Sequence, residues 1–272
     1  LNNVDCFVMK FDQNGDTLWT KIFGGPGFDT GSAIFALSDT TTIVVCNTNS
    51  YGNGLTDFWR VHLDRFGNMI DSTLYGTSVS ESAYNGDLTS DGGLVISGIK
   101  NSCPYVVKTN SSGGQEWDQS YTYAQDYCFI SQLPSGGYII ATRKTSAPDG
   151  LQACLIKTDT AGNVIWQKLY GTPDDESSLS KPIILNDGSI VIGGYHNPVN
   201  GSCAEAFVLK TDSSGNQVWF RTYNYVLTLD NFLYDIKATS DGGFIFAGFT
   251  FVNTQDSWIV KLDSMGCEVA GC

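Results

Sequence analysis

The residues best suited to chemistry are acidic, and five of them recur at similar places along the chain. Each stands nine to eleven residues before a turn rich in Asp, Ser and Gly. The five are Asp29, Glu81, Asp126, Glu176 and Asp230. If the fold gathered them, their oxygens could bind a cation such as calcium. The alternative, which we favour, is that each carboxylate caps backbone N–H groups nearby and binds no cation.

Paired carboxylates could also hydrolyse a glycosidic bond. The densest acidic cluster is "PDDE" at 173–176. However, Glu176 belongs to the recurring acidic series, and the two Asp residues suit a solvated loop. Motifs of the forms G-x-S-x-G and H-E-x-x-H are absent, and so is a phosphate-binding loop. His62 is expected in a strand and His196 in a solvated loop. We therefore expect that the chain is not an enzyme.

Eight cysteines are spread along the chain without a C-x-x-C pair, and zinc spacing is absent. Their number favours an oxidising compartment. The alternative is that several are small buried hydrophobic residues. We predict one disulfide, between Cys267 and Cys272.

A ten-residue segment recurs six times and predicts a hairpin at each place. "KTDSSGNQVW" at 210–219 has a near copy, "KTDTAGNVIW", at 157–166, and the six turn glycines lie 52, 46, 49, 53 and 51 residues apart. The Asp carboxylate can accept hydrogen bonds from backbone N–H groups of the turn, and the Gly supplies a positive φ. The turn residues with both Asp and Gly are Asp12, Gly15, Asp64, Gly67, Asp159, Gly162, Asp212, Gly215, Asp263 and Gly266.

A second hairpin follows each of the first five, with an Asp-Gly-Gly turn or a worn version of it, as in "TSDGGFIFAG". Four short strands in about fifty residues predict the blade of a β-propeller. The count of 22 strands predicts six blades with one incomplete; five blades with a spare hairpin, or seven blades, are the alternatives. The expected single domain spans 1–272, with units 1–28 (partial), 29–80, 81–125, 126–175, 176–229 and 230–272. In such a fold the five acidic residues would form a ring near one mouth of the channel.

Four tryptophans recur at one site of the unit, directly after the first hairpin turn. We interpret Trp19, Trp117, Trp166 and Trp219 as packing anchors between blades. The alternative is that they are aromatic platforms for sugars.

The pattern "DSWIVKLDSMG", followed in other units by an acidic residue and "SDGG", resembles the propeller repeats of large secreted proteins of Bacteroidetes. This resemblance covers nearly the whole chain and implies export by type IX secretion and display at the cell surface. A weaker likeness is to the tryptophan-docking repeats of quinoproteins, whose cofactor pocket we do not find. The resemblance also implies O-glycans after Asp, with turn chemistry as the favoured alternative. The candidate sites are Thr17, Thr40, Ser72, Thr160 and Ser264.

The formal charge of −13 disfavours nucleic acid and anionic membrane surfaces as partners. No apolar stretch approaches the roughly 20 residues needed to span a bilayer. The start lacks a signal peptide, so an export signal has been removed or the chain is part of a longer one.

We expect a secreted or cell-surface module for adhesion or binding, without a cofactor unless calcium binds. Its partner would be an extracellular protein or glycan, or the secretion or outer-membrane machinery of its own cell. The alternatives are a carbohydrate-active enzyme domain and a structural repeat in a surface adhesin or filament.

Overall fold

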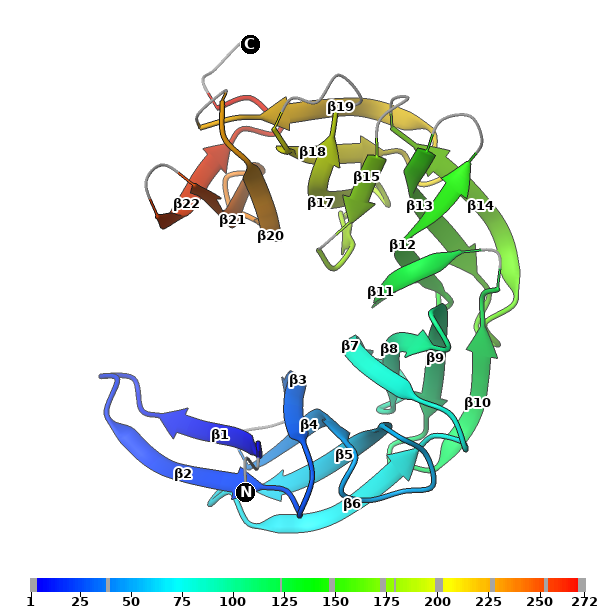
Figure 1. Cartoon of the computed structure of the whole chain (residues 1–272), viewed down its shortest axis with the longest axis vertical. Helices are drawn as coiled ribbons and strands as arrows, with labels where there is room; N and C mark the ends of the chain where they lie inside the picture. Colours follow the sequence, from blue (N-terminus) through cyan, green and yellow to red (C-terminus); the bar gives the residue numbers. More distant parts are fainter. Residues whose placement is uncertain are drawn as a thin grey trace. The chain divides into compact units, whose positions relative to one another are not determined.

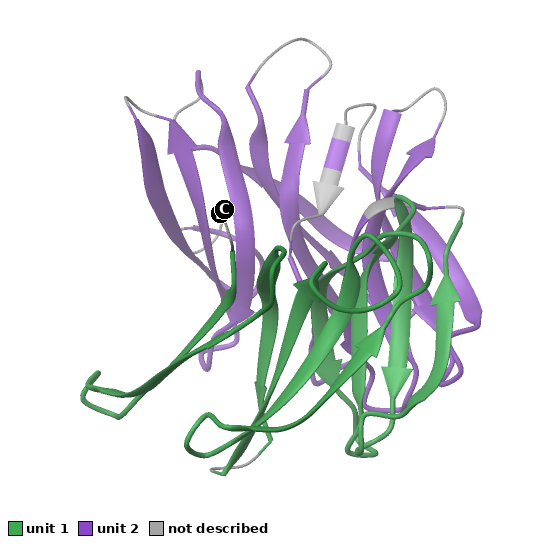
Figure 2. Ribbon diagram, turned by 60° about the horizontal axis from the view of Figure 1, so that its bottom comes forward, with its two compact units in different colours: residues 1–122 green, residues 123–272 purple. Residues whose placement is uncertain are grey.

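All regular secondary structure in the described residues is β-strand (Figure 1). The computed structural model describes residues 4–37, 40–122, 124–146, 150–171, 175–178, 180–198, 203–225, 228–251 and 254–268. The chain divides into two compact units, residues 1–122 and 123–272 (Figure 2). Within the described residues, no helix could span a membrane.

The first unit contains one hairpin and two four-stranded antiparallel sheets, in which strands adjacent in sequence are adjacent in space. The hairpin is β1 (Cys6–Phe11) and β2 (Thr17–Phe23). The first sheet is β3 (Asp29–Ala36), β4 (Thr41–Thr48), β5 (Asp57–Asp64) and β6 (Met69–Tyr75). The second is β7 (Glu81–Leu88), β8 (Leu94–Lys100), β9 (Cys103–Thr109) and β10 (Gln115–Ser120).

The second unit continues the same pattern in three sheets. Its first sheet is β11 (Gln125–Gln132), β12 (Tyr138–Ser146), β13 (Gly150–Thr158) and β14 (Val164–Tyr170). In the next, β15 (Asp175–Ser178) and β16 (Ile183–Ile184) both pair with β17 (Ile190–Asn197), and β18 (Glu205–Thr211) and β19 (Gln217–Tyr223) follow. The last is β20 (Asn231–Ala238), β21 (Phe244–Phe251) and β22 (Gln255–Leu262).

The fold is an all-β propeller type with five blades, so the prediction of six blades is wrong. Among the described strands, β1 and β2 pair with each other alone and form a two-stranded sheet. Counting hairpins treated it as half of a sixth blade, but no further described strand joins it. The arrangement matches the alternative of five blades with a spare hairpin.

The turns of the recurring ten-residue segments have the side-chain hydrogen bonds and the positive φ at glycine that the sequence predicts. At Asp212 the carboxylate Oδ1 accepts hydrogen bonds from Ser214 N (2.9 Å) and Asn216 N (2.8 Å), and Gly215 has φ +77°. In the third copy Asn110 replaces Asp and accepts the same two bonds through its amide oxygen. Local turn chemistry therefore sets the register of each hairpin.

The core lies between successive sheets of a unit. Strands β5, β9, β13 and β18 are buried along most of their length, whereas the edge strands β6 and β10 are largely exposed. One apolar cluster joins Val45 and Phe58 of one sheet to Leu94 and Ile96 of the next. Full burial of a side chain such as Phe58 stabilises the fold by about 2–3 kcal/mol.

Three of the four recurring tryptophans lie against the turn glycine of the following sheet. A Cβ on Gly67, Gly215 or Gly266 would come within 3 Å of Trp19, Trp166 or Trp219 respectively. The fourth, Trp117, is half-buried on β10. A tyrosine four residues after the tryptophan adds a hydrogen bond: the hydroxyl of Tyr170 donates to Gly215 O (2.7 Å), and that of Tyr223 donates to Gly266 O (2.7 Å).

Candidate functional site

Three of the five recurring acidic residues are fully buried at the start of the first strand of a sheet. They are Asp29 on β3, Glu81 on β7 and Glu176 on β15. A buried carboxylate is costly unless hydrogen bonds replace its hydration, so their contacts decide what these residues can do.

Each of the three accepts hydrogen bonds from nearby groups. Asp29 Oδ2 accepts from Gly25 N (2.8 Å) and Ser50 Oγ (2.6 Å). Glu81 accepts from Thr77 through its backbone N (3.2 Å) and hydroxyl (2.6 Å), and its Oε1 lies 3.5 Å from Lys100 Nζ. Glu176 Oε2 accepts from Gln152 Nε2 at 2.9 Å. The bonds from Gly25 and Thr77 hold the loops before β3 and β7, whereas Glu176 is held by a side chain of β13.

The two remaining members of the series differ. In the last sheet it is Asn231, not Asp230, that is buried at the start of the first strand and accepts a hydrogen bond from Tyr225 N (3.1 Å). Asp230 is partly exposed and accepts from Ala204 N (2.8 Å). The side chain of Asp126 lies outside the described residues. Among the described residues, no group of three or more His, Cys, Asp or Glu side chains is placed to hold a metal ion.

His196 lies in a strand, so the expectation of a solvated loop histidine is wrong. It is 6% exposed on β17, where it pairs across the sheet with Glu176 on one side and Glu205 on the other. Its Nε2 is 3.0 Å from Glu205 Oε2. Burial would raise the pKa of Glu205, but hydrogen bonds from Asn224 and His196 lower it. The signal available in the sequence was the apolar run "IVIGGY", which extends the strand to Asn197.

Asp57 is a buried acidic residue that the repeat pattern does not reveal. It is 2% exposed, and its carboxylate accepts hydrogen bonds from Asn53 N (3.0 Å) and Gly54 N (3.4 Å). Burial raises its pKa. Added Cβ atoms on Gly52, Gly54 and Gly76 would collide with it or come close, so the glycines in "YGNG" are the signal that could have indicated a buried side chain here.

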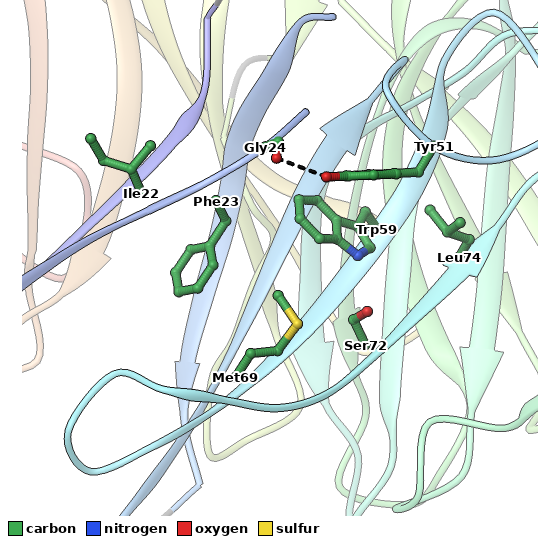
Figure 3. A pocket seen from close by; sticks show the side chains of 8 residues that line it. All are labelled: Ile22, Phe23, Gly24, Tyr51, Trp59, Met69, Ser72 and Leu74. Atoms are coloured by element: carbon green, nitrogen blue, oxygen red, sulfur yellow. Dashed lines mark hydrogen bonds between the residues drawn. The ribbon is translucent and has the colours of Figure 1, made fainter. Parts of the chain in front are cut away.

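An apolar pocket in the first unit, which we call the Tyr51 pocket, has a volume of about 420 Å³. The hairpin strand β2, the loop before β5, and strands β5 and β6 supply its walls. Figure 3 shows Met69 projecting toward Trp59 and Phe23, with Tyr51 beside Trp59. The lining residues are Ile22, Phe23, Gly24, Tyr51, Trp59, Met69, Ser72 and Leu74.

Two aromatic rings and one hydrogen bond fix the shape of this pocket. The centroids of Tyr51 and Trp59 are 5.3 Å apart at an interplanar angle of 56°. The hydroxyl of Tyr51 donates to Gly24 O at 2.8 Å (Figure 3). This bond ties the loop before β5 to the end of β2, so the pocket is formed before any ligand arrives.

A more polar pocket lies in the second unit. This Asp256 pocket has a volume of about 510 Å³ and is lined by Tyr225, Thr250, Asp256, Ser257, Trp258 and Ile259. Thr250 is 1% exposed, and its hydroxyl has no hydrogen-bond partner. Asp256 is exposed, and the ring of Tyr225 is 65% exposed. The accessible polar groups of this pocket are therefore those of Asp256 and Ser257, which lie beside an aromatic face.

The candidate modification sites are accessible, and one predicted disulfide partner is visible. Exposed side chains are found at all five candidate O-glycan sites, namely Thr17, Thr40, Ser72, Thr160 and Ser264. Cys267 is disulfide-bonded. Cys272 lies outside the described residues, so its pairing with Cys267 stays a prediction.

Comparison with known proteins shows the fold and no family. No family model matches the chain, and no curated relative matches it. A protein of unknown function from Dyadobacter fermentans DSM 18053 is similar in structure, with TM-score 0.55 and 11% identity over 89% of this chain and 78% of that one. An ulvan lyase, a polysaccharide lyase, has TM-score 0.53 and 10% identity over 85% and 67%. An α-L-arabinofuranosidase from Clostridium thermocellum ATCC 27405 has TM-score 0.48 and 9% identity over 88% and 92%.

The expectation that the chain is not an enzyme is overturned by these comparisons. An enzyme that acts on a polysaccharide, the ulvan lyase, is among the proteins with a similar fold. The expectation was drawn from missing linear motifs, whereas catalytic residues of a multi-strand fold come from separate strands and leave no such motif. At 10–11% identity the two likenesses with TM-scores above 0.5 establish a propeller-type fold and assign neither an activity nor a secretion route.

Proposed function

We propose that the chain is a secreted or cell-surface binding domain that holds an apolar side chain of a protein partner in the Tyr51 pocket. The single observation that carries this proposal is the lining: Ile22, Met69 and Leu74 are exposed apolar side chains around a preformed aromatic corner. Exposed apolar residues grouped around a hollow are typical of interaction sites.

The chemistry of the pocket favours an apolar anchor over a sugar. A sugar presents several hydroxyls that need hydrogen-bond partners. The polar side-chain groups here are the Ser72 hydroxyl, the Trp59 indole N–H and the Tyr51 hydroxyl, which already donates to Gly24 O. An aromatic or branched aliphatic side chain needs none and would be desolvated by the walls, as at the hot spots of protein interfaces. The charge of −13 would speed association with a basic partner.

Three further observations support an extracellular setting. The sequence resembles secreted Bacteroidetes propeller repeats, its five candidate O-glycan sites are exposed, and Cys267 is oxidised to a disulfide. Export by type IX secretion and a role in adhesion belong to this proposal.

Panning a displayed peptide library against the purified chain tests the site. We expect selected peptides to carry a Phe, Trp or Leu anchor and to lose at least about tenfold in affinity for Met69→Asp, because a carboxylate would be placed in the apolar pocket. Ile70→Asp is the matched control: Ile70 is the next residue of β6, also exposed, and it does not line the pocket. Peptides that bind both variants like the original chain would contradict the proposal.

The Asp256 pocket supports a second candidate function, carbohydrate recognition. The carboxylate of Asp256 and the hydroxyl of Ser257 could hydrogen-bond to sugar hydroxyls, while the exposed ring of Tyr225 could stack on a sugar face. A glycan array probed with the chain and with Asp256→Asn tests this function, with exposed Asp235→Asn as control. Binding that is lost only in Asp256→Asn supports it, and an array without hits contradicts it. A reducing-sugar assay on the hits tests hydrolysis.

A further inference from the structure

Two buried cysteines face each other between the hairpin β1–β2 and the next sheet. The Sγ atoms of Cys6 on β1 and Cys46 on β4 are 2.9 Å apart, although 40 residues separate them in sequence. Non-bonded carbon atoms rest at about 3.5–4.0 Å from each other, and sulfur is larger. The two sulfur atoms would need to approach by only about 0.9 Å to reach the length of a disulfide bond.

The surroundings leave room for this approach and shield it from water. Both side chains are at most 1% exposed and belong to an apolar cluster with Val8, Val44 and Trp59. Gly31, the cross-strand partner of Cys46, has no side chain, and a Cβ there would lie 3.3 Å from Cys6 Sγ. At Gly31, β3 therefore contributes only backbone next to the pair.

The repeats show that cysteine at these two positions is a local departure. The positions equivalent to Cys46 each pair across the sheet with the residue that follows a Cys6-equivalent position. They hold Gly98, Thr142, Gly194 and Gly248. The positions equivalent to Cys6 hold Phe58, Pro104, Ala153, Ala206 and Ser257. The two cysteines therefore stand at positions where the hairpin β1–β2 and the next sheet bring their side chains into contact.

We infer that Cys6 and Cys46 form a disulfide bond that ties β1 to β4 when the protein meets an oxidant. The oxidant required is a small disulfide such as oxidised glutathione. One cysteine thiolate attacks it and releases one small thiol, and the second thiolate then attacks the mixed disulfide and releases the other. The two cysteines lose two protons and two electrons in total, and the small disulfide is reduced to two thiols.

The bond would stabilise the hairpin β1–β2, which has fewer strands than any other sheet of the described residues. Among the described strands β1 pairs with β2 alone. Packing on the next sheet must therefore hold the hairpin, together with the hydrogen bond from Asp29 N to Val4 O (2.6 Å). A covalent link across 40 residues limits how far the hairpin can move in the unfolded chain and in partly open states. Because both thiols are buried, oxidation takes place before the hairpin has packed or while it is open.

Peptide mapping without reductant tests the bond. The chain is incubated with oxidised glutathione, unfolded in guanidinium with iodoacetamide, digested and analysed by mass spectrometry. We expect a cross-linked peptide pair that contains Cys6 and Cys46 and that separates after reduction. Alkylation of both cysteines in a sample whose Cys267 is still cross-linked would overturn the inference.

Thermal unfolding gives an independent measurement. The variant Cys46→Ala removes the sulfur from β4 and leaves a small side chain at a position that holds glycine in three other sheets, at Gly98, Gly194 and Gly248. We expect its Tm to fall by several degrees under oxidising conditions, and reductant to lower the Tm of the original chain more than that of Cys46→Ala. Cys154→Ala, at a buried cysteine of β13, is the control and should respond to reductant like the original chain. Equal effects of reductant on the original chain and on Cys46→Ala would contradict the bond.

Discussion

The guanidinium of Arg60 lies against the backbone of Gly113, at the place where other sheets present a tryptophan. A Cβ on Gly113 would be 2.8 Å from Arg60 Nη1. The repeat position that holds tryptophan in four other copies holds Asp71 here, and Asp71 Oδ1 lies 2.5 Å from Arg60 Nη1. His62 Nδ1 is 2.8 Å from the other oxygen of Asp71. An ion pair thus replaces an indole as the contact with the next turn.

Removing the charge of Asp71 should expose the cost of this replacement. Arg60 is 1% exposed, so Asp71→Asn would leave a buried cation with a weaker partner and should lower the free energy of unfolding by about 1.5–3 kcal/mol. Asp235→Asn is the control, because the Asp235–Lys237 pair is exposed on both sides and should change stability by less than about 1 kcal/mol. Urea unfolding of both variants measures the difference, and equal midpoints would refute the structural role of Asp71.

A glycine-to-alanine pair separates backbone strain from contact with tryptophan. Gly215 and Gly242 have φ of +77° and +82°, so alanine at either costs about 1–2 kcal/mol. At Gly215 the new Cβ would also lie 2.7 Å from Trp166, whereas nothing is within 4 Å at Gly242. We expect Gly215→Ala to be the more destabilising by about 1–3 kcal/mol. Thermal unfolding of both variants is the measurement, and similar losses would mean that the indole moves aside.

Asp91 should contribute to stability at neutral pH and lose that contribution in acid. A hydrogen bond from Lys108 Nζ (2.8 Å) lowers the pKa of Asp91 to about 2, helped by the Thr89 hydroxyl. Because the folded pKa lies below the unfolded value near 3.9, the contribution is complete above about pH 4 and is lost as the pH falls toward 2. We expect Asp91→Asn to lose less Tm than the original chain over this range. Parallel curves of Tm against pH would count against the prediction.

Calcium should leave the melting temperature unchanged. The carboxylates of Asp29 and Glu81 already accept hydrogen bonds from the loops that precede their strands, so they serve as caps. Differential scanning fluorimetry with calcium or with a chelator measures the effect. A rise of several degrees in calcium that disappears in Glu81→Gln would show instead that a cation binds to these residues.

The resemblance to secreted repeats predicts added mass on the native protein. Thr17, Thr160 and Ser264 lie exposed in or beside Asp-x-x-Gly turns, where a transferase could reach them. Intact-mass spectrometry of protein from its own cells should show glycan mass above that of the polypeptide. A single peak at the polypeptide mass would leave turn chemistry as the reason for these residues.

Turn residues and strand faces could be predicted from the sequence because their causes are local. Asp212 and Gly215 define a turn within five residues, and the apolar residues of "FVLK" define a buried strand. The burial of Asp57 could not be predicted, because its surroundings come from two separate loops, one with Gly52 and Gly54 and the other with Gly76. Nor could the role of Lys108, whose Nζ reaches across the sheet to Asp91.

The number of blades was predicted wrongly for a related reason. Each hairpin is encoded locally, but pairing between hairpins depends on which strand edges meet. His196 shows the same limit on a smaller scale: its environment comes from Glu205 of a different strand, nine residues away. The hairpins could be predicted from residue types, but the surroundings of His196 depend on which strands lie next to each other.

The two-stranded hairpin β1–β2 has a consequence for amide exchange. An isolated hairpin is marginally stable in water, and this one depends on contacts such as the hydrogen bond from Trp19 Nε1 to Arg65 O (2.9 Å). Its backbone amides should therefore exchange with deuterium sooner than those of β4 and β5, which pair on both sides. Exchange that slows in β1 after oxidation, but not in β10, would show that a bond between the sulfur atoms of Cys6 and Cys46 holds this hairpin closed.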